Sequence, residues 1–114
     1  MGEYWYMINL DKMEYVAIPP MKFWEYMANE NSKVLFWLCA KEDMVGYKTL
    51  GRWAGDRVIV IGDYDPDFET YIEGARDITE EVVREVLDYA SKNDLPDMAN
   101  FMKETLEIIE SVRD

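Results

Sequence analysis

The chain has 114 residues, 49% hydrophobic and 14% aromatic, which is the length of one domain with enough apolar surface for a core. It has no histidine and one cysteine, so histidine-based triads, the usual zinc ligands and an intrachain disulfide are excluded. The formal net charge of −12 disfavours direct binding to nucleic acid, because no basic stripe is present to displace counterions from phosphate.

The N-terminal residues MGEYWYMINL lack the basic start of a secretion signal. No apolar run in the chain approaches the roughly 18 residues that span a bilayer. We therefore expect residues 1–114 to form a single cytoplasmic domain that does not enter the membrane.

Two strands are predicted at the start of the chain. Residues 3–10 and 13–18, EYWYMINL and MEYVAI, are rich in aromatic and β-branched residues, and the polar pair Asp11-Lys12 lies between them. Pro19 ends the second strand because proline cannot donate a hydrogen bond to a neighbouring strand.

Two helices are predicted next. Residues 21–30, MKFWEYMANE, begin after Pro20, which the first turn of a helix tolerates. Residues 32–42, SKVLFWLCAKE, are apolar nearly all round, which fits a buried helix or a central strand; we favour a helix capped by Ser32. Cys39 is expected to be a small buried side chain within it.

A hairpin is predicted in the middle of the chain. Residues 47–54, YKTLGRWA, and 57–64, RVIVIGDY, flank a Gly-Asp pair that suits a type II′ turn. Residues 58–61, VIVI, are apolar at every position, so both faces should be covered, and we expect a central strand.

Two helices are predicted in the last third, over residues 77–93 and from about Asp94 onward, with Thr79 as N-cap and Pro96 in a first turn. The predicted fold is α+β: an antiparallel sheet of about four strands covered by helices, with two acidic C-terminal helices. The predicted buried faces are Val82, Val83, Val86, Leu87 and Ala90 on the first, and Met98, Phe101, Met102, Leu106, Ile109 and Val112 on the second.

Two motifs resemble those of an uncharacterised family of small microbial proteins. The first is N-L-D-K at residues 9–12 followed by Glu14-Tyr15; the second is W-A-G-D-R at residues 53–57 followed by G-D-Y at residues 62–64. The resemblance covers roughly residues 4–80. The sequence departs from the family by lacking a histidine after the second strand and a glycine-rich loop before the tryptophan. The resemblance implies a shared fold and no particular activity.

Alternating carboxylates in DYDPDFE superficially suit a calcium loop. An EF-hand loop that started at Asp63 would require glycine at position six and glutamate at position twelve, where this sequence has Phe68 and Gly74. We expect an acidic turn, no metal site and no cofactor. The carboxylates concerned are Asp63, Asp65, Asp67 and Glu69.

The segment around the Gly-Asp pair has two interpretations. Arg52, Trp53, Asp56 and Arg57 could form an exposed recognition tip in which arginine pairs with a carboxylate of a partner. Alternatively, Asp56 serves the turn, Trp53 packs on the core and Arg57 bridges locally, which is the interpretation that we favour.

The negative charge lies mainly in the second half of the chain. Residues 1–64 hold 9 acidic and 7 basic residues (net −2), and residues 65–114 hold 15 and 5 (net −10), which together give the 24 and 12 of the whole chain. We expect this half to bind a basic protein surface, or else to be only a solvated face. The candidate partner-binding residues are Asp77, Glu80, Glu81, Asp88, Glu104, Glu107, Glu110 and Asp114.

The function that these features favour is a non-enzymatic interaction module, in a narrower form an inhibitor that mimics the charge of nucleic acid. The many aromatic and methionine residues of so short a chain further predict a homodimer. The sequence has no nucleophile–base pair and no phosphate-binding loop. The alternative is a small-molecule-binding domain or a carboxylate-based enzyme with a pocket near Trp53–Arg57.

Overall fold

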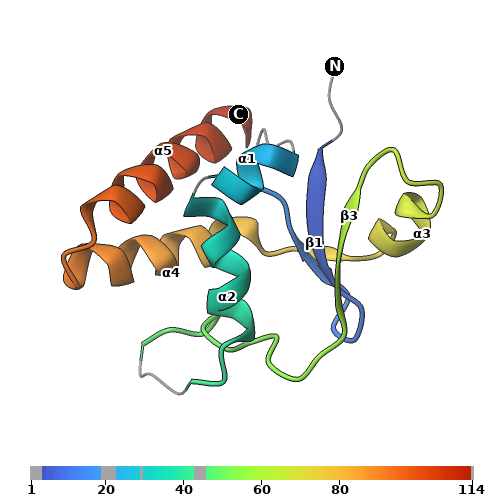
Figure 1. The fold of residues 1–114 in the computed structure, drawn as a ribbon, viewed down its shortest axis with the longest axis horizontal. Helices are drawn as coiled ribbons and strands as arrows, with labels where there is room; N and C mark the ends of the chain where they lie inside the picture. The colour runs from blue at the N-terminus through green and yellow to red at the C-terminus, as the bar shows by residue number, and fades with distance from the viewer. Residues whose placement is uncertain (1–3, 19–22, 29, 43–45, 114) are drawn as a thin grey trace.

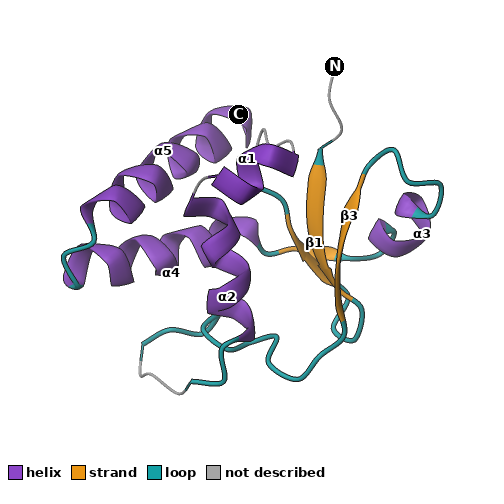
Figure 2. Cartoon of the chain, in the orientation of Figure 1, coloured by secondary structure: helices purple, strands orange, loops and turns teal. Residues whose placement is uncertain are grey.

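The fold is α+β, with a four-stranded sheet between two layers of helices (Figures 1 and 2). The computed structural model describes residues 4–18, 23–28, 30–42 and 46–113. Its elements are β1 (Trp5–Asn9), β2 (Glu14–Val16), α1 (Phe23–Ala28), the short 3-10 helix η1 (Glu30–Ser32), α2 (Lys33–Cys39), β3 (Val58–Gly62), α3 (Phe68–Ile72), β4 (Arg76–Asp77), α4 (Thr79–Lys92) and α5 (Pro96–Arg113).

The sheet has the strand order β3-β1-β2-β4. The pairs β3-β1 and β1-β2 are antiparallel, whereas β4 runs parallel to β2, so the sheet is mixed and not purely antiparallel as predicted. Helices α1, α2, α4 and α5 lie on one side of it and α3 lies on the other (Figure 1). Met7 and Val16 belong to the core on the four-helix side, while Tyr6 packs against Phe68 of α3 with ring centroids 4.8 Å apart and the rings tilted by 59°.

The predicted N-terminal strands are confirmed, and a buried side chain shapes the turn between them. The side-chain oxygen of Asn9 accepts hydrogen bonds from the backbone N–H groups of Asp11 (2.8 Å) and Lys12 (2.7 Å). Met13 then adopts a positive φ of 56°, which reverses the chain. Asparagine suits this position because its short amide bonds to the backbone two and three residues on.

The predicted helices are confirmed, with corrections at the starts of α2 and α4. Ser32 occupies the N-cap position of α2 as predicted, but its side chain makes no capping hydrogen bond. Thr79 is the first helical residue and Ile78 occupies the N-cap position. The side-chain oxygen of Asp77 accepts the Thr79 N–H at 2.9 Å, so Asp77 acts as the cap, while Oγ1 of Thr79 accepts the N–H of Ala17. Sequence spacing alone could not decide between neighbouring polar residues.

The predicted hairpin at the Gly-Asp pair is wrong, because the residues before it form turns instead of a strand. Two backbone N–H groups of this loop cap the end of α2: Gly51 donates to Trp37 O (2.9 Å) and Trp53 donates to Leu38 O (2.8 Å). Gly51 has φ +71° and lies so close to α2 that a Cβ there would be 2.5 Å from the Ala40 oxygen. This segment therefore donates hydrogen bonds to the unpaired carbonyl groups at the end of α2 and does not pair as a strand.

Two expectations about buried segments are also corrected. The apolar run in β3 predicted a central strand, but β3 is an edge strand. Such a run is typical of a strand covered on both faces, but Val60 is 48% exposed, and the run carries no information about neighbours within the sheet. Cys39 was expected in the core and is exposed, because α2 packs on the core through its other sides, at Val34, Trp37 and Leu38.

The C-terminal helices are only mildly acidic, since α4 and α5 each hold 4 acidic and 2 basic residues (net −2). The densest negative charge precedes them: residues 63–73 hold 5 acidic and no basic residues. In the part of the chain that the structure describes, no helix has the length and apolar character needed to cross a membrane.

Candidate functional site

The most elaborate polar site surrounds Glu14, a carboxylate that is only 3% exposed at the sheet. Nε of Arg52 donates to Oε1 at 3.0 Å and to Oε2 at 3.1 Å, and Nη2 of the same residue also contacts Oε2. The indole N–H of Trp53 donates to Oε1 at 3.0 Å. Nη2 of Arg76 donates to Oε2 at 3.1 Å, while its Nη1 donates to Glu81 at 3.0 Å.

This arrangement fixes Glu14 as an anion. Burial by itself would raise the pKa of Glu14, but hydrogen bonds from Arg52, Trp53 and Arg76 outweigh it and hold the pKa below its ordinary value. A general acid or base needs a pKa near the working pH and room for a substrate. Glu14 has neither, so the cluster is a structural ion pair.

A second polar cluster joins the turn after β1 to the turn before β3. Nδ2 of Asn9 donates to Oδ2 of Asp56 at 2.9 Å, and Lys12 forms an ion pair with the same oxygen. Asp11 accepts the backbone N–H of Arg57 at 2.7 Å and its Nε–H at 2.9 Å. Hydrogen bonds from Lys12 and Asn9 lower the pKa of Asp56, which keeps the carboxylate charged.

The candidate recognition residues of the middle segment are therefore engaged with the N-terminal hairpin. Trp53 is fully buried, Arg52 is bound to Glu14, and Asp56 closes the turn cluster. Arg57 is the exception, because 74% of its side chain is exposed although it is paired with Asp11. The favoured structural interpretation of Asp56, Trp53 and Arg57 agrees with these contacts.

The two sequence motifs, at residues 9–15 and 53–64, contribute many of the residues of these clusters. Residues 9–15 contribute the hairpin, residues 53–57 contribute the loop, and the G-D-Y residues 62–64 contribute contacts at the end of β3. There, Asp63 N–H donates to Tyr4 O at 2.9 Å, and Tyr4 N–H donates to Oδ1 of Asp63 at 3.1 Å. These residue types are thus explained by the fold that they hold together.

Most of the candidate partner-binding carboxylates are engaged within the chain. Arg84 bridges Glu80 on α4 and Glu110 on α5, at 2.7 and 2.8 Å. Asp88 accepts the Tyr47 hydroxyl at 2.7 Å and pairs with Lys92 at 3.1 Å; this contact with Asp88 raises the pKa of Tyr47 to about 12. Glu81 pairs with Arg76, Asp77 caps α4, and Asp114 lies outside the described residues.

Glu104 and Glu107 differ from the rest of this set. Both are exposed on α5, and neither forms an ion pair with another described residue. The acidic segment over residues 63–73 lies on the opposite side of the molecule from α5 (Figure 1). The negative charge is therefore spread over two sides.

The acidic turn after β3 is organised by its own hydrogen bonds. Oδ1 of Asp65 accepts the Asp67 N–H at 2.8 Å, and Oδ1 of Asp63 accepts from Tyr4. Among the described residues, no group of three or more acidic or cysteine side chains is arranged to hold a metal ion.

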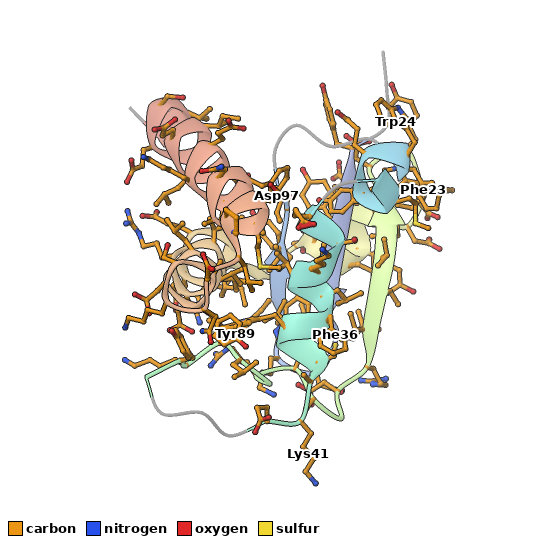
Figure 3. All side chains as sticks on the ribbon, turned by 60° about the vertical axis from the view of Figure 1, so that its left-hand side comes forward. Phe23, Trp24, Phe36, Lys41, Tyr89 and Asp97 are labelled. Carbon is orange, nitrogen blue, oxygen red and sulfur yellow. The ribbon has the colours of Figure 1, made fainter. Side chains whose placement is uncertain are left out.

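An apolar cavity of about 400 Å³ lies between α2, α4 and the start of α5. Trp37 and Tyr89, with ring centroids 5.4 Å apart, form part of its wall, and the Trp37 indole N–H is already used by Oγ1 of Thr49 at 2.9 Å. Lys41 extends outward from the lower end of α2 (Figure 3). The lining residues are Lys33, Phe36, Trp37, Ala40, Lys41, Glu42, Leu50, Val86, Tyr89 and Met98.

Exposed apolar side chains gather on α1, α2 and β3, a surface that we call the apolar edge. Figure 3 shows Phe23 projecting from α1 and Phe36 on the outer surface of α2. A second hollow, of about 240 Å³, lies between these elements and is lined by Trp5, Met7, Phe23, Tyr26, Met27, Ser32, Leu35 and Val60. The apolar edge consists of Phe23 (54% exposed), Met27 (72%), Phe36 (77%) and Val60 (48%).

Sequence reasoning missed Glu14 and Val60. Glu14 lies two residues before Val16 in a strand, so both point to the same face, and a carboxylate on a buried face requires basic partners. That signal was present in the sequence. Val60 carried no comparable signal, since the strand neighbours of an apolar run cannot be read from the run itself.

No known family model, curated protein or solved structure matches the chain.

Proposed function

We propose that this protein is a non-enzymatic protein-interaction module that acts as a homodimer. The observation that supports the proposal is the apolar edge, where Met27 is 72% and Phe36 is 77% exposed to water. Phe23, Met27 and Val60 line one hollow, and exposed apolar surface grouped in this way is typical of protein contacts. The polar residues of the two motifs, by contrast, are occupied in holding the fold.

We also propose that the acidic part of the chain binds a basic surface of a partner protein. Glu104 and Glu107 are the best placed residues, because they are exposed on α5 and form no ion pair with another described residue. Charged rims of this kind steer association and make it depend on salt. An inhibitor that mimics nucleic-acid charge is the narrower form of the proposal, and residues 63–73 would then bind separately from α5.

A basic peptide tests this assignment without a known partner. We expect a fluorescent lysine decapeptide to bind the protein with an affinity that falls steeply between low and physiological salt. The double variant Glu104→Gln/Glu107→Gln should bind severalfold more weakly, with a shallower salt dependence. Glu110 is left unchanged because it pairs with Arg84.

The matched control removes the same charge from the other side of the molecule. Glu69→Gln/Glu73→Gln should weaken binding of the lysine peptide much less than the α5 variant does. Equal losses in the two variants would show that only net charge matters, and would overturn the assignment of α5.

A small-molecule-binding protein is the second candidate, favoured by the cavity beside Trp37 and Tyr89. Its volume of about 400 Å³ falls in the usual range for ligand sites, roughly 300–1,000 Å³. This cavity lies beside α2, whereas the sequence predicted a pocket near Trp53–Arg57.

The dye anilinonaphthalene sulfonate is a suitable probe for this candidate. Met98→Trp fills the cavity and should abolish saturable dye binding, whereas Met27→Trp, which fills the other hollow, should leave it unchanged. Dye binding that is absent in the parent, or unaffected by Met98→Trp, would remove the candidate.

A further inference from the structure

The outer side of β3 is open in the described part of the chain. Among the described strands β3 pairs only with β1, and Figure 3 shows it at the margin of the sheet with no ribbon beside it, α1 and α2 in front and α3 behind. Natural edge strands usually carry lysine or proline, which block pairing with another chain. The sequence VIVIG of β3 has neither.

The hydrogen-bond pattern shows which backbone groups face that open side. Leu10 N–H donates to Arg57 O at 2.8 Å, and Asp63 N–H donates to Tyr4 O at 2.9 Å. Hydrogen-bonded positions alternate along an antiparallel pair, so Ile59 and Ile61 also direct their groups to β1. The N–H and C=O groups of Val58, Val60 and Gly62 therefore point outward.

Most of these outward groups are open to a new strand. The Gly62 carbonyl already accepts the Asp65 N–H at 3.1 Å, so Gly62 offers only its own N–H to a new strand. Val58 and Val60 each offer a carbonyl. Val60 also offers an N–H at the centre of the strand, so its groups would be central to any new pairing.

The side chains beside these groups are apolar. Val60 lies opposite Met7 and thus on the sheet face that α1 and α2 cover. It lines the hollow of about 240 Å³ together with Phe23 and Met27. A strand added at Val60 would bring its own apolar side chains over this hollow.

The charges at the ends of β3 favour an identical strand in the antiparallel direction. Arg57 precedes the strand and Asp63 follows it, each three residues from Val60. Antiparallel pairing about Val60 places Arg57 opposite Asp63 of the other copy, whereas parallel pairing would align like charges. This strand also lies in the half of the chain whose net charge is only −2, where two copies repel each other least.

We propose that β3 pairs antiparallel with β3 of a second copy about a two-fold axis at Val60, forming one sheet through both protomers. The two Val60 residues exchange N–H···O=C hydrogen bonds, and each Gly62 N–H donates to Val58 O of the other copy. Phe23 and Met27, which line the hollow beside Val60, cover the seam on the helix side. The inference rests on the homodimer proposed above and specifies its interface.

Sedimentation equilibrium on two matched variants tests the interface. The parent should sediment as a dimer of the 13.5 kDa chain. Val60→Lys places like charges on the axis and should weaken association at least about tenfold, about 1.4 kcal/mol. Val112→Lys makes the same change at an exposed position of α5 (76% exposed) and should leave the dimer intact.

The outcomes separate the two proposals. A parent that is monomeric at high concentration would overturn both the homodimer and its interface. A dimer that survives Val60→Lys would overturn the β3 interface and leave the homodimer, which would then use another surface.

A cross-linking experiment decides the question even if Val60→Lys fails to fold. Cys39 is the only cysteine, so Cys39→Ser provides a cysteine-free background. Hydrogen-bonded partners in antiparallel strands have Cα atoms about 5.5 Å apart, a distance that a disulfide spans. Val60→Cys should therefore form a disulfide-linked dimer under mild oxidation, much faster than Val112→Cys. Equal rates would overturn the interface.

Discussion

The indole nitrogen of Trp53 donates a hydrogen bond of 3.0 Å to Oε1 of Glu14, which lies 39 residues earlier in the chain. This contact joins the two sequence motifs in the interior of the protein. Because a buried carboxylate is costly unless it is fully hydrogen-bonded, Glu14 makes the loop before β3 depend on the N-terminal hairpin. Four predictions concern these contacts and the turns around them.

Replacing Glu14 by Gln should destabilise the fold. The variant removes the charge that Arg52 and Arg76 bind, and we expect the free energy of unfolding to fall by about 2–3 kcal/mol, which urea denaturation measures. Both arginines are partly exposed and can regain water, which limits the loss. Glu107→Gln, an exposed change of the same chemistry, should cost less than about 0.5 kcal/mol. Equal losses would contradict the role of the cluster.

The contribution of Glu14 should disappear in acid. Its pKa is lowered in the folded protein, so its stabilising effect is complete above the ordinary value of 4.5 and is lost as the pH falls through the folded value. The stability difference between the parent and Glu14→Gln should stay constant near neutral pH and shrink below about pH 4.5. Because both proteins share the other acidic groups, the difference isolates Glu14. A difference that grows in acid would contradict this sign.

Gly51 and Gly55 should respond differently to alanine. Both have positive φ, and at Gly55, where no atom of the described residues lies within 4 Å of a Cβ, alanine should cost about 1–2 kcal/mol from backbone strain. At Gly51 the Cβ would also approach the Ala40 oxygen to 2.5 Å, which adds at least about 1 kcal/mol. Thermal unfolding of the two variants checks the order. Equal costs would mean that the loop does not lie so close to α2.

The acidic turn after β3 should not respond to divalent cations. Asp63 and Asp65 accept backbone hydrogen bonds, and no metal cluster exists among the described residues. Millimolar Ca²⁺ or Mg²⁺ should leave the melting temperature nearly unchanged, because only an ion that binds the folded state raises it. A saturable rise that Asp65→Asn abolishes would reveal a site.

Local sequence patterns were sufficient for α1, α4, α5 and the first two strands, whereas they left residues 32–42 open between helix and strand and did not indicate α3. In α4 and α5 the apolar residues recur at helical spacing, and Pro96 begins α5, so each helix was recognisable without its neighbours. Near Pro19 and Pro20 the second strand had a clear stop, although those two residues lie outside the described part. The α+β class followed from these elements alone.

Contacts between distant residues determined what the sequence could not show. The loop containing Gly51 and Trp53 has the composition of a strand, but its N–H groups bind the end of α2 and its indole binds Glu14. The fourth strand, β4, has only two residues and pairs parallel to β2, which no local pattern indicates. The same limit applied to the candidate site, because the exposure of Val60 depends on the strand order of the sheet.

Hydrogen exchange at the backbone of β3 tests the proposed interface most directly. In a dilute, monomeric sample the amides of Ile59 and Ile61, bonded to β1, should be protected, while those of Val60 and Gly62 exchange freely. At concentrations where the protein sediments as a dimer, we predict that the Val60 and Gly62 amides become protected as well. If they exchange freely at every concentration while the protein is dimeric, β3 is not the interface.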